Sequence, residues 1–242
     1  MEATFATTWV SALDEVAAEI LRQAGVNSPP VDVLLLAERL QIPVVFDAGQ
    51  PGRARHKRLG GASSIFLKPD ERPERLQWAA AHELGEVVAH QVAARAGAEG
   101  GLSPGLREQI ANQIASRLLL PRAWFVADAQ GLGGDVLELK SVYGTASHEL
   151  IAWRLLDLPE PSIVTIFDHG RVTRRRSNLD GQSPPLSPME RACWRQVHQS
   201  GKPLERSIGA VRVQGWPVHE PQWKREILRS RPLGEGDPGE TW

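Results

Sequence analysis

The chain has 242 residues, 41% of them hydrophobic and 24% charged, a composition that fits a globular protein with one or two domains. A formal net charge of −1 excludes a large overall excess of either charge. The single cysteine, Cys193, excludes a disulfide framework and a cysteine-rich zinc site, and its apolar neighbours predict a buried, unreactive thiol. Because no apolar run is long enough to span a membrane and the first residues lack the pattern of a signal peptide, we expect a cytoplasmic protein with no membrane partner.

In chain order, the first half of the sequence predicts several helices and two short strands. Apolar residues recur at helical spacing, as at Leu13, Val16 and Ile20, and glycines and prolines separate the periodic segments. These patterns predict helices over 9–24, 31–40, 72–95, 103–120 and 122–130, and strands over 44–46 and 63–67. Residues 47–58 are rich in glycine, proline and positive charge and predict a loop.

The second half changes character after Pro159 and Pro161. Before these prolines, residues 135–156 predict two helices around a turn at Gly144, which is a helix-turn-helix pattern. After them, the sequence predicts strands over 163–167, 172–176 and 208–213, a helix over 189–199, and a disordered tail over the last ten residues. We therefore expect a mostly helical α+β protein in three parts: residues 1–134, a helix-turn-helix segment over 135–158, and a small α+β module over 159–242.

The most informative segment is AAAHELGEVVAHQ, residues 79–91, inside the helix predicted over 72–95. His82 and Glu86 are four residues apart, so they lie one turn apart on one helix face and can converge on a metal ion. This is the spacing of the His-Glu-x-x-His zinc peptidase motif, in which the glutamate after the first histidine, here Glu83, is the general base. The helix is apolar on most sides and should be buried, and buried carboxylates need partners such as a metal ion. The next helix offers a third ligand, Glu108, although the motif alone leaves a solvated glutamate-rich face as an alternative.

Two sequence blocks at this spacing resemble the ImmA/IrrE metallopeptidase family. HELG is followed, about twenty residues later, by the pattern E-x-x-A-N…A-x-x-L-L-x-P. The matching residues are His82, Glu83, Leu84, Gly85, Glu108, Ala111, Asn112, Ala115, Leu118, Leu119 and Pro121. The later stretch KSVYGTASHELIAWRLLDL resembles the helix-turn-helix of the same family, so the resemblance covers about residues 10–157.

This resemblance implies a zincin-like metallopeptidase domain with a helix-turn-helix, followed by the small C-terminal module. It implies that His82 and Glu108 are metal ligands and that Glu83 deprotonates the attacking water. Family members are switches that cleave a transcriptional repressor and turn on stress-response or mobile-element genes, so the implied partner is a repressor of helix-turn-helix type. From its position alone, the segment 65–67 is expected to be an edge strand that aligns the substrate by β-pairing.

The chain departs from the family at Glu86, where the family pattern has histidine. A carboxylate can bind zinc, so we expect His82, Glu86 and Glu108 to hold Zn²⁺, while the oxygen-rich ligand set also suits Mn²⁺. Two negative ligands would weaken the Lewis acidity of the ion. His90, one turn further along the helix, could replace His82 in a register that pairs it with Glu86, but Val87 would then occupy the position of the general base. We therefore expect His90 to pack or to hydrogen-bond behind the ligands.

Two alternative functions stay open. The carboxylate at Glu86 favours a catalytically impaired regulator on the same fold, acting by protein or DNA binding. Direct DNA binding would rest on the helix-turn-helix and on Arg171, Arg174, Arg175 and Arg176. The second helix of the pair is dominated by packing residues, and a solvated sheet face explains the arginines equally well, so direct DNA binding is not favoured.

Overall fold

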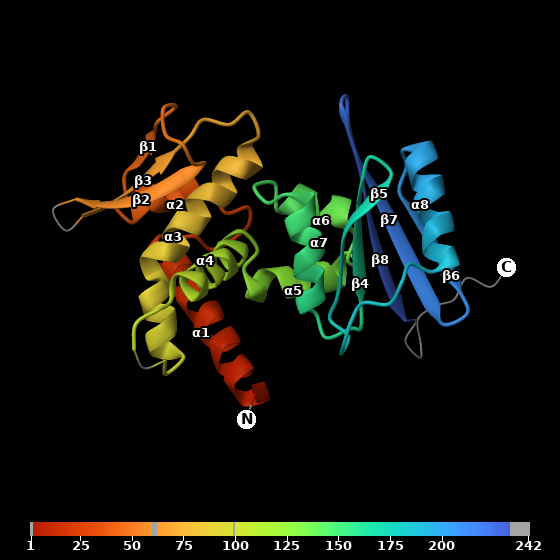
Figure 1. Ribbon diagram of the computed structural model, residues 1–242, viewed down its shortest axis with the longest axis horizontal. Helices are drawn as coiled ribbons and strands as arrows, with labels where there is room; N and C mark the ends of the chain where they lie inside the picture. Colours follow the sequence, from red (N-terminus) through yellow and green to blue (C-terminus); the bar gives the residue numbers. More distant parts are fainter. Residues whose placement is uncertain (1, 60–61, 99, 233–242) are drawn as a thin grey trace. The chain divides into compact units, whose positions relative to one another are not determined.

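A computed structural model describes residues 2–59, 62–98 and 100–232 (Figure 1). The chain divides into two compact units: unit 1 comprises Met1–Asp128 and Ser141–Ser147, and unit 2 comprises Ala129–Lys140 and His148–Trp242. The described residues form eight α-helices and two β-sheets, which confirms the predicted α+β class. None of the helices in these residues is both long and apolar enough to cross a membrane. The three-part division at residues 134 and 158 stays a prediction.

The helices of unit 1 surround one buried helix, α3. The elements are α1 (Glu2–Gln23), α2 (Val33–Arg39), α3 (Pro73–Arg95), α4 (Pro104–Leu119) and α5 (Arg122–Gly131), whose last three residues belong to unit 2. Helices α1, α2 and α4 all contact α3. The inward positions of α3 are mostly alanine and valine, small side chains that let its neighbours approach closely. The prediction that this helix is buried is confirmed.

The sheet of unit 1 has three strands, β1 (Val44–Phe46), β2 (Ala54–Leu59) and β3 (Ala62–Leu67), in the order β1-β3-β2. Strand β3 is parallel to β1 and antiparallel to β2. The predicted loop over 47–58 is therefore wrong for its last five residues, because an edge strand can carry the polar run Arg55, His56, Lys57 with one side in solvent. The expectation that 65–67 is an edge strand is also wrong, since both edges of β3 are already paired.

Unit 2 is an antiparallel sheet with a helix on each face (Figure 1). Its elements are α6 (Val136–Val142, up to Lys140 in this unit), α7 (His148–Arg154), the 3-10 turn η1 (Leu155–Asp157), β4 (Ile163–Asp168), β5 (Arg171–Ser177), α8 (Pro188–Ser200), β6 (Leu204–Ile208), β7 (Val211–Glu220) and β8 (Trp223–Pro232). The strand order is β5-β4-β8-β7-β6. Helix α7 contacts β4 and β8, and α8 contacts β6, β7 and β8.

The strand predicted over 208–213 is confirmed for residues 211–213, which begin β7, and is wrong for the turn that precedes them. Strand β6 ends at Ile208, and Gly209, with φ of 58°, turns the chain into β7. Strand β8 was not predicted, because charged residues interrupt its apolar pattern, yet Glu226 and Arg229 within it are buried. The disordered tail predicted over the last ten residues lies outside the described part of the chain.

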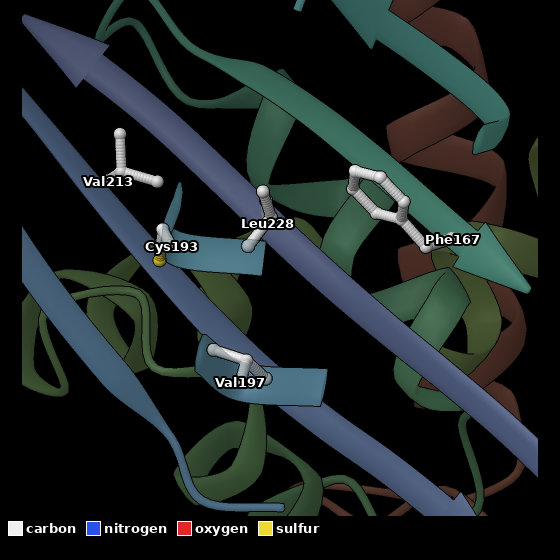
Figure 2. Close-up of a cluster of buried hydrophobic side chains, with 5 residues drawn as sticks. All are labelled: Phe167, Cys193, Val197, Val213 and Leu228. Carbon is white, nitrogen blue, oxygen red and sulfur yellow. The ribbon is translucent and has the colours of Figure 1, made fainter. Parts of the chain in front are cut away.

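One buried hydrophobic cluster of unit 2 lies between the sheet and α8 (Figure 2). Its fully buried side chains are Phe167, Cys193, Val197, Val213 and Leu228. A Cβ at Gly215 would come within 2.8 Å of both Val197 and Leu228, so the bare backbone there lets α8 approach the sheet. Cys193 is buried, as predicted, and burial raises the pKa of its thiol to about 11.

Three of the four arginines of β5 have partners within unit 2. Arg174 forms an ion pair with Glu149 of α7, and Arg176 lies 4.9 Å from the ring centroid of the tryptophan in α7. Arg175 points to the opposite face and forms two hydrogen bonds, of 3.0 and 3.1 Å, with Glu190 of α8. Arg174 and Arg176 therefore share one face of β5, and both help to hold α7 against the sheet.

Candidate metal centre

The candidate centre depends on an unusually close contact between α3 and α4. A Cβ at Gly85 would lie 2.6 Å from the backbone oxygen of Ala111 and 2.8 Å from its Cα. Real side-chain atoms do not approach a backbone this closely, so only glycine fits the contact. The glycine of the HELGE segment therefore has a packing role: it lets the backbone of α4 lie against α3.

This contact brings together the three ligands expected from the sequence. One potential ligand atom from each of His82, Glu86 and Glu108 lies within 4.8 Å of the other two. The Nε2 atom of His82 is 3.4 Å from Oε2 of Glu108 and 4.0 Å from Oε1 of Glu86. The His82 side chain is 18% exposed, whereas that of Glu108 is 56% exposed, so the group opens to solvent on the α4 side.

Asn112 orients two members of this group. Its Oδ1 atom lies 3.1 Å from Nδ1 of His82, and its Nδ2 atom donates a 3.1 Å hydrogen bond to Oε1 of Glu108. Because an amide oxygen only accepts, Nδ1 of His82 donates this hydrogen bond, and Nε2 is the ring atom near the carboxylates. The sequence placed Asn112 in the family pattern without a role, although its position one helical turn after Glu108 was a usable signal.

Glu83 lies beside the group and is only 6% exposed. Desolvation raises its pKa to about 7; the negative charges of Glu86 and Glu108 act in the same direction. The charge of His82 and a hydrogen bond from the backbone of His56 partly oppose this increase. A carboxyl group with a pKa near neutrality is suited to accept and return a proton, which is what a general base requires.

The donor set fits a divalent metal ion. Bonds of about 2.0–2.1 Å at tetrahedral angles place neighbouring ligand atoms about 3.3 Å apart, close to the His82–Glu108 separation of 3.4 Å. The Glu86 carboxylate has to approach His82 by less than 1 Å, and its 31% exposure leaves room for that movement. One imidazole and two carboxylates suit zinc and, through their oxygens, manganese.

His90 does not take part in the group. It is exposed on α3, so the expectation that it packs or hydrogen-bonds behind the ligands is wrong. His90 is five residues after Gly85, which faces α4, so the turn of the helix places His90 on a different face of α3. The structure thus brings together the residues that the sequence selected at positions 82, 83, 86 and 108, and leaves His90 apart from them.

Comparison with known proteins identifies the family of the segment that contains this group. Residues 37–155 match the sequence model of Peptidase_M78, described as the IrrE N-terminal-like domain. No curated protein sequence matches the chain. A solved structure described as a Mycobacterium tuberculosis transcriptional regulator is similar in fold, with a TM-score of 0.64 and 19% sequence identity over 91% of this chain and 75% of that one. Residues 37–155, which include the HELGE helix, thus form an IrrE N-terminal-like domain of the Peptidase_M78 family.

Proposed function

We propose that this protein is a metal-dependent, site-specific endopeptidase that cleaves a transcriptional repressor in the cytoplasm. The observation that carries the proposal is the convergence of His82, Glu86 and Glu108 on one point beside the buried Glu83. A hydrolytic metal centre needs ligands that leave one side open and a base within reach of the attacking water. The partly exposed ligands and the electrostatic coupling of Glu83 to them support the proposal.

The residues of this chain have separate roles in the proposed reaction. His82, Glu86 and Glu108 would hold Zn²⁺ or Mn²⁺, which supplies Lewis-acid polarisation of the scissile carbonyl and of the attacking water. A Glu83 carboxylate oxygen accepts the proton of that water and later returns it to the leaving amine. Asn112 holds His82 in the tautomer that keeps Nε2 free for the ion.

The proposed substrate class is a repressor with a helix-turn-helix DNA-binding domain. It follows from the family resemblance, and the description of the structural neighbour as a transcriptional regulator is consistent with it. Cleavage would release genes of a stress response or of a mobile element. An enzyme that acts on one protein needs selectivity more than turnover, so a metal of reduced Lewis acidity is compatible with this role.

The test is a search for a cut site in cell extract. Extract is incubated with zinc- or manganese-loaded wild type, with Glu83→Gln, or with Glu108→Ala, and new protein N-termini are identified by mass spectrometry. We expect a new N-terminus in a helix-turn-helix protein with wild type alone, because Gln cannot accept the proton and Ala removes a ligand. Identical sets of N-termini for wild type and Glu83→Gln would refute peptidase activity.

Glu86 favours a second candidate function, a catalytically impaired regulator on the same fold. A second carboxylate ligand leaves the ion less able to polarise water than the family's histidine would. The variant Glu86→His separates the two candidates. Cleavage by Glu86→His and not by wild type would show that the natural chain regulates by binding, whereas cleavage by wild type supports the enzyme.

Direct DNA binding is the least supported function. Three arginines of β5 already contact α7 or α8 inside unit 2: Arg174, Arg175 and Arg176. Their cationic groups are therefore less available to a phosphate. Phosphate contacts need free cationic groups that can displace counterions. If the protein bound DNA with an affinity that falls steeply with salt and is lost on replacing these arginines, direct DNA binding would become the favoured function.

A further inference from the structure

A second group of imidazole and carboxylate side chains lies in unit 2. His198 is in the last turn of α8, His219 is near the end of β7, and Glu226 is in β8. One potential ligand atom from each lies within 4.8 Å of the other two. His198 and Glu226 are 28 residues apart in the sequence, and no motif in the sequence connects them.

The strand register explains why these residues meet. Strands β7 and β8 are antiparallel, with Pro217 opposite Glu226. Since alternate residues share a face, His219 lies diagonally across from Glu226. Gly215 is on the same face, and its contact with Val197 shows that this is the face covered by α8. The sheet therefore supplies one imidazole and the carboxylate, and the helix supplies the other imidazole.

Glu226 is fully buried, so its charge requires compensation. Trp194 Nε1 donates a 3.1 Å hydrogen bond to Oε2. The other oxygen, Oε1, lies 2.8 Å from Nδ1 of His198 and 2.6 Å from Nε2 of His219. The indole therefore holds one carboxylate oxygen in place, and both imidazoles point at the other.

We propose that His198 Nδ1, His219 Nε2 and Glu226 Oε1 bind a divalent transition-metal ion of the zinc type. Two imidazoles and one carboxylate are an established protein ligand set for zinc, and imidazole also suits iron, nickel and copper. An ion with bonds of about 2.0–2.1 Å requires ligand atoms about 3.3 Å apart, so both imidazoles have to move outward by less than 1 Å. The side chains of His198 and His219 are 32% and 21% exposed, which permits this movement and leaves the outer side to water.

The proposed ion would link the end of α8 to the β7–β8 hairpin. In its absence both imidazoles hydrogen-bond to the buried carboxylate, so the unit has a folded metal-free state as well. Because the ion binds the folded arrangement and not the unfolded chain, it should raise the thermal stability of unit 2. This site is independent of the one proposed for peptidase activity.

The test uses the full chain with the first site removed. In the double variant Glu86→Gln, Glu108→Gln, we expect one equivalent of Zn²⁺ per chain by equilibrium dialysis and elemental analysis after treatment with chelator. Zn²⁺ should raise the unfolding temperature of this variant, and Co²⁺ should produce visible absorption from a site with imidazole ligands. Adding His198→Gln or His219→Gln should weaken zinc binding by at least about 100-fold, since loss of even a supporting residue costs about 10–100-fold.

The substitutions are chosen to keep the fold. Gln can still donate a hydrogen bond toward Glu226, so the buried carboxylate keeps a partner. The matched control is His169→Asn, which removes a histidine of the same unit outside the group; Asn tolerates its φ of 48°. This control should leave zinc affinity unchanged.

Two results would overturn the proposal. The first is a natively folded double variant that binds no zinc, which would leave His198, His219 and Glu226 as a hydrogen-bond network only. The second is zinc binding that survives both histidine substitutions. If a histidine variant fails to fold, X-ray absorption of the zinc-loaded double variant decides the question, because fewer than two imidazole ligands contradict the proposed site.

Discussion

The two groups of histidine and glutamate in this protein combine the same residue types in opposite proportions. The group in unit 1 has one imidazole and two carboxylates, and its carboxylates Glu86 and Glu108 are 31% and 56% exposed. The group in unit 2 has two imidazoles around one carboxylate, Glu226, whose side chain has no exposure. The group in unit 1 is open to solvent and has more carboxylates than imidazoles, whereas the group in unit 2 has a buried carboxylate that accepts hydrogen bonds from its neighbours.

This difference separates a site suited to chemistry from one suited to stability. In unit 1, burial raises the pKa of the neighbouring Glu83, and the negative charges of Glu86 and Glu108 raise it further. The partly exposed carboxylates of Glu86 and Glu108 are reachable from solvent. In unit 2 the carboxylate is satisfied by His198, His219 and Trp194 before any ion binds. We therefore expect changes in the first group to affect metal binding and activity, and changes in the second to affect folding as well.

The largest expected effect on stability comes from removing the buried carboxylate. In the presence of chelator, Glu226→Ala should lower the free energy of unfolding by about 3–4 kcal/mol, because it leaves a cavity and three unpaired hydrogen-bond donors. The matched change Glu86→Ala, at a partly exposed carboxylate, should change it by less than about 0.5 kcal/mol. Denaturant unfolding measures the stability of both variants. Equal decreases in the free energy of unfolding would contradict the view that the group in unit 2 supports the fold more than the group in unit 1 does.

The second effect concerns the pH dependence of Glu83. Unfolded Glu83 loses its proton near pH 4.5, whereas folded Glu83 keeps it to about pH 7, so its contribution to stability falls as pH rises between these values. Glu83→Gln has no such proton to lose. In the presence of chelator, its free energy of unfolding minus that of wild type should therefore increase across this pH window, by at most about 3 kcal/mol, and stay constant above it. Unfolding curves of both proteins from pH 4 to pH 8 provide the measurement. A difference that does not vary with pH would refute the raised pKa.

The third effect tests the close approach of the helices in unit 1. Gly85→Ala places a methyl group against the backbone of Ala111 and should cost about 2 kcal/mol by pushing α3 and α4 apart. It should also weaken zinc binding by His82, Glu86 and Glu108. Gly105→Ala in α4 is the control, since its added Cβ meets no atom within 4 Å. Equal behaviour of the two variants would show that the contact does not position the ligands.

The smallest effect should come from the residue behind the ligands. Asn112→Leu removes the hydrogen bonds to His82 and Glu108, so zinc affinity at this site should fall about tenfold, or ~1.4 kcal/mol. The measurement uses a background in which His219→Gln has blocked the second group. Unchanged affinity would mean that the helices alone orient these ligands.

Local patterns in the sequence predicted much of unit 1. The spacing of His82 and Glu86 depends only on helical geometry, and the apolar residues around them correctly indicated a buried helix. Strand β2 was missed because its polar residues are permitted on a sheet edge, and β8 was missed because Glu226 and Arg229 are buried with partners instead of being exposed. Both failures concern charged residues whose surroundings are formed by distant parts of the chain.

The family resemblance, the α+β class and the His-Glu-x-x-Glu segment could be predicted from the sequence, because each depends on local residue patterns. The folded structure was needed to show that β3 is central, that Gly85 lets α4 approach α3, and that Asn112 links His82 to Glu108. It alone also revealed the group at His198, His219 and Glu226. Contacts between segments far apart in the chain depend on packing and strand register, which no local pattern encodes.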